Sequence, residues 1–151
     1  MAEQLERQLV VFELGNEAYG ININAVREII RMQAITSVPD SPEYVRGVIN
    51  LRGRVIPVAD LRRRFRLPET EANADTRVLV VDIAGEDIGV VVDAVTEVKR
   101  VLNSAVEPAS TLSTTDASYY IEGTAKLENQ LLILLDLEHA LRGPALAGAA
   151  A

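Results

Sequence analysis

The sequence predicts a mainly β fold in which two small barrels pack around one shared hydrophobic core. Most apolar segments are short, rich in valine and isoleucine, and separated by glycine or asparagine turn signals. The chain also matches itself in two places, in the same order. Each half of this duplication has only about 70 residues, which is near the lower limit for an independent core.

Strands are predicted where short apolar segments lie between turn residues. We expect strands at residues 8–14, 18–23, 47–51, 55–58, 77–84, 88–93, 119–127 and 131–135. Gly15, Gly53 and Gly85 are expected to have positive φ in hairpins, whereas Gly20 and Gly89 indicate a bulge or a close approach of two backbones.

Helices are expected to be few and short. Asp60 and Asp136 each precede an apolar residue and are predicted to cap the short helices that close the two halves.

The internal repeat indicates the domain organisation. Residues 8–29 match residues 77–98 at an offset of 69, and residues 47–65 match residues 123–141 at an offset of 76. We call residues related by these offsets repeat mates. The offset grows by 7, so a net insertion is expected around residues 102–118.

We therefore expect a single domain over residues 1–151. It is divided into a first subdomain at about 8–67, a polar linker at 68–75, a second subdomain at about 76–142 and a flexible tail at 143–151. This prediction includes the possibility that the N-terminal residues cross over from the first subdomain into the second.

Composition and charge argue against several classes of function. The absence of cysteine removes disulfides, thiolate metal sites and cysteine nucleophiles, and the net charge of −7 opposes binding to nucleic acid or anionic lipid. No apolar run is long enough to span a bilayer, so a cytoplasmic protein is expected. The single histidine, His139, is predicted on an exposed helical face, and we expect no catalytic residue, metal or cofactor.

Residues 62–66 form the one basic cluster, Arg-Arg-Arg-Phe-Arg. The cluster is interpreted either as a docking patch for an acidic protein partner or as a short solvated helix with Leu61 and Phe65 pointing inward. These two interpretations are left open. Nucleic acid is disfavoured as the partner by the neighbouring acidic residues and the overall charge.

Residues 45–62, VRGVINLRGRVIPVADLR, resemble the signature of the CheW family, in which an Asn-Leu-Arg-Gly turn links two strands and leads into Pro-Val-x-Asp-Leu. The resemblance extends from residue 8 to about residue 142. It implies two five-stranded SH3-like barrels around a shared core and a non-enzymatic scaffold. The scaffold would couple the chemoreceptor signalling tip to the regulatory domain of a CheA-type histidine kinase. It would be a monomer in isolation and assemble into receptor–kinase arrays at the membrane.

The resemblance also implies the binding residues. The family positions tied to receptor binding are Val26, Gly47, Arg52, Gly53, Gly89, Val95 and Gly123. Arg52 is expected to form an ion pair with Glu28. The repeat mate of Arg52 is Glu128, and function explains this asymmetry better than folding does. Core packing is the alternative role for the two valines.

The kinase surface is assigned to the second half, near Leu79, Val81 and Val91, with core packing again as the alternative.

Three other functions remain as alternatives. The chain could be the coupling protein of a parallel chemosensory pathway that controls surface motility, pili or a second messenger. It could also be a small hydrolase or metal enzyme that uses scattered carboxylates, or a nucleic-acid-binding barrel. The lone histidine and the acidic charge disfavour the last two.

Overall fold

The computed structural model describes residues 5–41, 44–108 and 120–141. The first half contains β1 (Glu6–Leu14), β2 (Glu17–Asn22), the 3-10 turn η1 (Ile23–Ala25), β3 (Val26–Arg31), β4 (Val45–Leu51), β5 (Arg54–Asp60) and α1 (Leu61–Arg64). The second half contains β6 (Arg77–Ile83), β7 (Glu86–Val92), β8 (Ala94–Leu102), η2 (Asn103–Ala105), β9 (Glu107–Pro108), β10 (Ile121–Lys126), β11 (Leu131–Leu135) and α2 (Leu137–Leu141).

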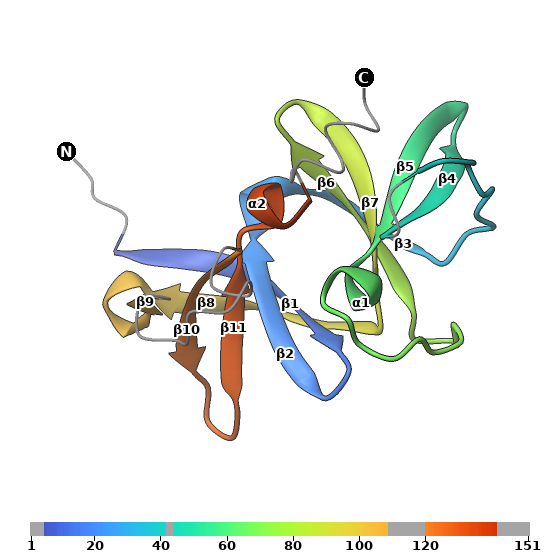
Figure 1. Ribbon diagram of the computed structural model, residues 1–151. Helices are drawn as coiled ribbons and strands as arrows, with labels where there is room; N and C mark the ends of the chain where they lie inside the picture. Colours follow the sequence, from blue (N-terminus) through green and yellow to red (C-terminus); the bar gives the residue numbers. More distant parts are fainter. Residues whose placement is uncertain (1–4, 42–43, 109–119, 142–151) are drawn as a thin grey trace.

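The strands form two sheets that exchange hairpins between the halves of the sequence. Barrel 1 has the strand order β3-β6-β7-β5-β4, and barrel 2 has the order β8-β1-β2-β11-β10-β9 (Figure 1). The hairpin β6–β7 therefore completes the barrel of the first half, and β1–β2 completes that of the second. Each exchanged hairpin is joined to the rest of its barrel by one parallel pair, β5 with β7 in barrel 1 and β11 with β2 in barrel 2. Each barrel therefore combines strands from both predicted subdomains, 8–67 and 76–142, and the N-terminal strands do cross into barrel 2.

Each sheet closes through the segment that follows its first outer strand, which is β3 in barrel 1 and β8 in barrel 2. Thr36, downstream of β3, makes two backbone hydrogen bonds of 2.9 Å with Val48 in β4. Glu107, downstream of β8, pairs with Thr124 in β10. Val48 and Thr124 are repeat mates, so the two barrels close in equivalent ways.

Gly47 and Gly123 permit this closure. A β-carbon on Gly47 would lie 2.0 Å from the carbonyl oxygen of Thr36, and one on Gly123 would lie 2.5 Å from that of Glu107. Both glycines also lie at register shifts in their strands. Any larger residue would push the closing backbone away, so these positions require glycine for packing reasons alone.

The hydrophobic core has a shared part and two separate parts. The largest cluster of buried side chains joins the barrels, with Val10 and Phe12 of β1 beside Leu79 and Val81 of β6. Two smaller clusters include Leu132 of barrel 2 and side chains of β4, β5 and β6 in barrel 1. The predicted mainly β fold with a shared core is confirmed.

Both predicted helix caps are present. The Asp60 side chain accepts hydrogen bonds from the backbone N–H groups of Arg62 and Arg63. Asp136 accepts one of 3.1 Å from the N–H of His139. Each carboxylate satisfies donors that a helix of one turn leaves without an internal partner.

All eight predicted strands are present to within two residues at each end, but β3, β8 and the two-residue β9 were not predicted. Polar and charged residues interrupt the apolar pattern in β3 and β8, because much of their surface faces solvent. Residue 119 and most of the proposed insertion at 102–118 lie outside the described residues, as does the tail at 143–151.

Closure at the two glycines predicts a clear order of stabilities. Gly47→Ala and Gly123→Ala should each lower the free energy of unfolding by about 2–3 kcal/mol, because backbone must move to admit a methyl group. Gly85→Ala should cost about 1 kcal/mol, since Gly85 has φ 89° but open space around it. Urea denaturation measures all three, and equal losses would contradict the closure argument.

Candidate protein-binding site

Arg52 lies at the tip of the hairpin between β4 and β5. Arg52 and Gly53 have φ of 52° and 86°, the signature of a two-residue turn with both central residues at positive φ. The Asn50 side chain accepts a 2.9 Å hydrogen bond from the N–H of Gly53. The Asn-Leu-Arg-Gly sequence therefore builds the turn, which leaves the Arg52 side chain 67% exposed.

Glu28 of β3 holds the Arg52 guanidinium. Arg52 Nη1 donates to Glu28 Oε1 at 3.1 Å, and Nη2 donates to Oε2, so the pair is bidentate. These hydrogen bonds lower the pKa of Glu28 and raise that of Arg52. The predicted ion pair is thus present, while its part in binding stays a prediction.

Val26 and Val95 lie at the margin of the shared core. Val26 is paired with Val81, and Val95 with Phe12. Directly opposed residues of an antiparallel pair project to the same face, and both partners belong to the shared core. Each valine is only partly buried against that core. They therefore help pack the interface between the barrels and remain partly accessible to a partner.

Ile29 and Val98 extend this apolar surface and were missed from the sequence. Ile29 is paired with Leu79 and Val98 with Val10, again members of the shared core. Their side chains are 43% and 50% exposed. The two residues are repeat mates, and this is the signal that could have identified them.

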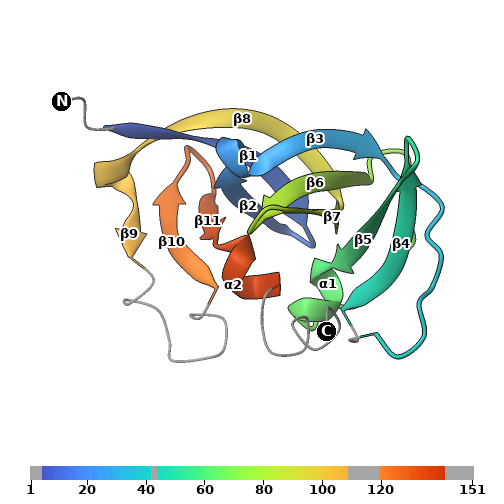
Figure 2. The ribbon, with the colours of Figure 1, turned by 90° about the horizontal axis from the view of Figure 1, so that it is seen from above.

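We refer to Val26, Ile29, Val95 and Val98 together as the β3/β8 apolar face. Figure 2 shows β3 and β8 on one side of the molecule, with α1 and α2 on the other. Glu28 is paired instead with Val80, a member of the barrel 1 interior cluster. The Glu28–Arg52 pair therefore lies on the opposite face of β3 from the apolar residues.

The remaining predicted receptor residues are buried glycines. Gly47 and Gly89 flank Val58 on neighbouring strands of barrel 1, and Gly123 lies in barrel 2. A β-carbon on Gly89 would approach a methyl group of Val78 to 2.9 Å. The three glycines shape the barrels, so any effect on binding would act through backbone geometry.

Comparison with known proteins gives a consistent result. The family model of the CheW-like domain matches residues 8–145. This chain belongs to the CheW-like domain family. It is 34% identical to the chemotaxis protein CheW of Klebsiella aerogenes, covering 92% of this chain and 84% of that protein. It is 37% identical to CheW of Bacillus subtilis, with 89% and 86% covered.

A solved structure is also similar to this CheW-like domain. The scaffolding protein TtCheW from Thermoanaerobacter tengcongensis superimposes with a TM-score of 0.84 at 36% identity, covering 92% of this chain and 94% of that one. The fold class that the family resemblance implied is therefore supported by sequence and by structure.

The predicted kinase-contact residues require a correction. Leu79 and Val81 are completely buried in the shared core, and Val91 is half-buried beside the barrel 1 interior. Both faces of β6 are covered: Leu79 and Val81 face the shared core, and the alternate residues face the interior of barrel 1. Leu79 and Val81 cannot touch a partner in the folded CheW-like domain.

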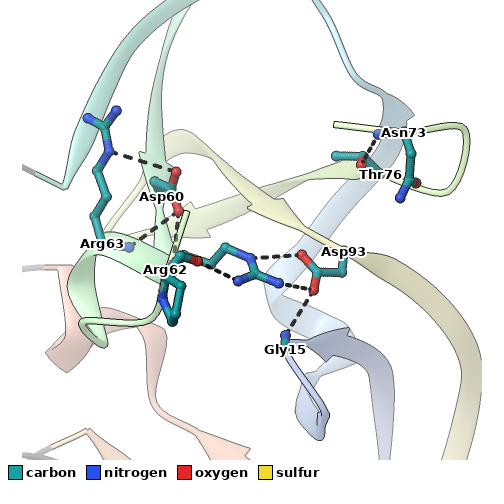
Figure 3. Close-up of polar contacts among 8 residues, drawn as sticks. Gly15, Asp60, Arg62, Arg63, Asn73, Thr76 and Asp93 are labelled. Carbon is teal, nitrogen blue, oxygen red and sulfur yellow. Dashed lines mark hydrogen bonds and ion pairs between the residues drawn. The ribbon is translucent and has the colours of Figure 1, made fainter. Parts of the chain in front are cut away.

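The arginines of residues 62–66 are largely engaged within the molecule. Arg62 makes a 2.6 Å ion pair with Asp93, and Arg63 approaches Asp60 (Figure 3). Arg63 also bonds to Glu69. These contacts hold α1 against β7–β8 and the linker. They favour the structural interpretation of the cluster over a free docking patch.

Arg64 lies where the two halves of the duplication meet. Its guanidinium carbon is 5.6 Å from the ring centroid of Tyr44 and 5.0 Å from that of Tyr120, which are repeat mates. Its Nε donates a 2.7 Å hydrogen bond to the carbonyl oxygen of Ala140, its own repeat mate. Arg64 thereby links α1 to α2 across the interface between the barrels.

The histidine is exposed, as expected, and its Nδ1 lies 2.5 Å from Asp136 Oδ2 at the start of α2. Among the described residues, no group of three or more histidine, cysteine, aspartate or glutamate side chains could hold a metal ion. No helix within the described ranges is long and apolar enough to cross a membrane.

The Glu28–Arg52 pair predicts a pH-dependent effect. In Arg52→Ala the pKa of Glu28 should rise towards its ordinary value, which carboxyl-carbon NMR titration would measure. Because the folded-state pKa is lowered, the stabilisation from this pair is present above the unfolded pKa and is lost as pH falls through the folded one. The stability difference between wild type and variant should shrink over that acidic range, and a constant difference would contradict the assignment.

The Arg64 contacts predict selective destabilisation. Arg64→Ala should lower the free energy of unfolding by about 1–2 kcal/mol, since it removes cation–π contacts and a hydrogen bond at the interface. The neighbouring exposed Arg66 provides the control, and Arg66→Ala should change stability by less than about 0.5 kcal/mol. Thermal or urea unfolding distinguishes the two, and a neutral Arg64→Ala would show that the link is dispensable.

Proposed function

We propose that this CheW-like domain is a chemotaxis coupling protein that joins chemoreceptor signalling tips to the regulatory domain of a CheA-type histidine kinase. The proposal is supported by relatives named chemotaxis protein CheW and by similarity to a structure described as a scaffolding protein. Such a protein acts by holding partners together, so its function resides in interface free energies and requires no catalytic step.

The observation that carries the proposal is the β3/β8 apolar face. Its four side chains come in two equivalent pairs, one from each barrel, and they continue the shared core outward to solvent. An exposed apolar surface of this kind suits the apolar stripe of an amphipathic helix. A receptor tip is a helical hairpin, and its two helices could use the two pairs.

Arg52 provides a charged anchor in barrel 1 that has no equivalent in barrel 2. Its bidentate pair with Glu28 restricts the guanidinium before any partner arrives, which lowers the entropy lost on binding. The repeat mate Glu128 carries the opposite charge, so barrel 2 cannot offer the same contact. Barrel 1 therefore offers a charged contact that barrel 2 lacks, on the opposite face of β3 from the apolar side chains, and this asymmetry favours one orientation of a partner that reaches both.

The kinase contact is proposed at the barrel ends. Val55 at the start of β5 and Leu131 at the start of β11 are exposed apolar repeat mates. They can reach a partner, unlike the buried Leu79 and Val81. Apolar anchors of this kind supply most of the affinity in small protein interfaces.

Isothermal titration calorimetry with two separate partners tests the proposal. The chain should bind both a receptor signalling-tip fragment and the kinase regulatory domain. Arg52→Ala should weaken receptor binding about tenfold or more, and Ile29→Ser with Val98→Ser should do the same, because each removes an anchor. Kinase affinity should be unchanged in both variants.

Val55→Ser supplies the matched control, since it removes an equally apolar side chain outside the β3/β8 apolar face. It should preserve receptor binding and reduce kinase binding. Failure of the wild-type chain to bind either partner would refute the chemotaxis assignment. Binding to a different kinase and receptor set would instead place the chain in a parallel chemosensory pathway.

A further inference from the structure

We propose that Asp87 is a positioning residue for Arg52: it ties together the two strand segments that carry the Glu28–Arg52 pair. The consequence for receptor binding rests on the proposed function, whereas the positioning itself does not. Asp87 is the second residue of β7 and lies in neither of the segments that it connects.

Asp87 bridges two guanidinium groups. Its Oδ1 lies 2.6 Å from Nε of Arg27, and its Oδ2 lies 2.6 Å from Nη2 of Arg54. The Asp87 side chain is only 9% exposed, whereas the side chains of Arg27 and Arg54 are 51% and 63% exposed. Arg27 also contacts Asp82 at 3.1 Å.

The two arginines lie next to the functional pair in the sequence. Arg27 directly precedes Glu28 on β3, and Arg54 follows the turn that contains Arg52. β3 and β5 are not neighbours in barrel 1, because β6 and β7 lie between them. Asp87 therefore connects the two backbones in addition to the direct contact between Glu28 and Arg52.

Asp87 also keeps Arg54 away from Glu28. The charge of Arg54 already acts on Glu28 and lowers the pKa of that carboxyl. The ion pair with Asp87 holds the Arg54 side chain against β7. Without Asp87, Arg54 would be free to compete with Arg52 for the Glu28 carboxylate.

The duplication shows that the barrel does not need this network. The repeat mates of Arg27, Arg54 and Asp87 are Thr96, Gln130 and Ala18, all uncharged. Barrel 2 nevertheless has the same strand arrangement and closure.

Barrel 2 buries Ala18 where barrel 1 places the Asp87 carboxylate. Burying a carboxylate costs free energy unless it is paired, and replacing buried ion pairs by apolar residues is often neutral or stabilising. The network is present only in the barrel that carries Arg52, which indicates a role beyond folding.

The test transfers the residues of barrel 2 into barrel 1. The triple variant Arg27→Thr, Arg54→Gln, Asp87→Ala removes Asp87 together with both of its partners and keeps Glu28 and Arg52. It leaves Asp82 without Arg27, but the Asp82 side chain is 36% exposed and its charge stays solvated. We expect stability in urea equal to or above that of the wild type. The Nε–Hε NMR signal of Arg52 should broaden and exchange faster with water, because its side chain is less restricted.

The variant should also bind the receptor-tip fragment about three- to tenfold more weakly, with kinase-domain affinity unchanged. Asp93→Asn is the control, because it breaks the 2.6 Å pair with Arg62 and touches neither Glu28 nor Arg52. It should leave the Arg52 signal and the receptor affinity as in the wild type.

The two measurements separate the two proposals. An Arg52 signal that is unchanged in the triple variant overturns the positioning role, whatever the receptor result. If the Arg52 side chain becomes less restricted in the triple variant but receptor affinity is unchanged, the positioning of Arg52 has no role in receptor binding. If the wild-type chain does not bind the receptor fragment, the proposed function fails, and the NMR comparison still decides whether Asp87 positions Arg52.

Discussion

Strands β1 and β2 complete a barrel whose other strands come from the second half of the chain, and β6 and β7 complete the barrel of the first half. This exchange makes each barrel depend on residues that are far apart in sequence. The shared core follows from it, since β1 and β6 each present one face to their barrel interior and the other to the interface. Neither half can bury its apolar surface alone, so the two barrels are expected to fold together.

Barrel closure adds a second constraint that shapes the interpretation of the site. Gly47 and Gly123 lie where closing backbones approach so closely that a methyl group does not fit. Positions that resemble binding residues in a family signature can therefore be required by the fold itself. Arg52 differs from them, since its side chain is exposed and its turn is already built by Asn50 and Gly53.

The duplication provides an internal control for function. The two barrels share strand arrangement, closure and capping carboxylates, so these features belong to the fold. Arg52 and the two arginines beside the Glu28–Arg52 pair occur in barrel 1, and none of their repeat mates in barrel 2 is an arginine. Residues that differ between the equivalent barrels are therefore the best candidates for partner recognition, because the fold itself does not require them.

The sequence by itself determined the mainly β class, the duplication, eight strands, both helix caps and the hairpin turns. These features depend on local periodicity and turn chemistry, which neighbouring residues specify. The sequence did not reveal β3, β8 or the two-residue β9. Register shifts interrupt the alternation of apolar and polar residues in β3 and β8, and most of β8 is exposed.

Only the tertiary structure decided which hairpin joins which barrel. It also showed that Leu79 and Val81 point into the shared core, and that Asp87 meets Arg27 and Arg54. A valine on a strand has the same local signature whether its face is covered by a second barrel or by solvent. That distinction depends on contacts between residues distant in sequence, and these exist only once the two halves have exchanged their hairpins.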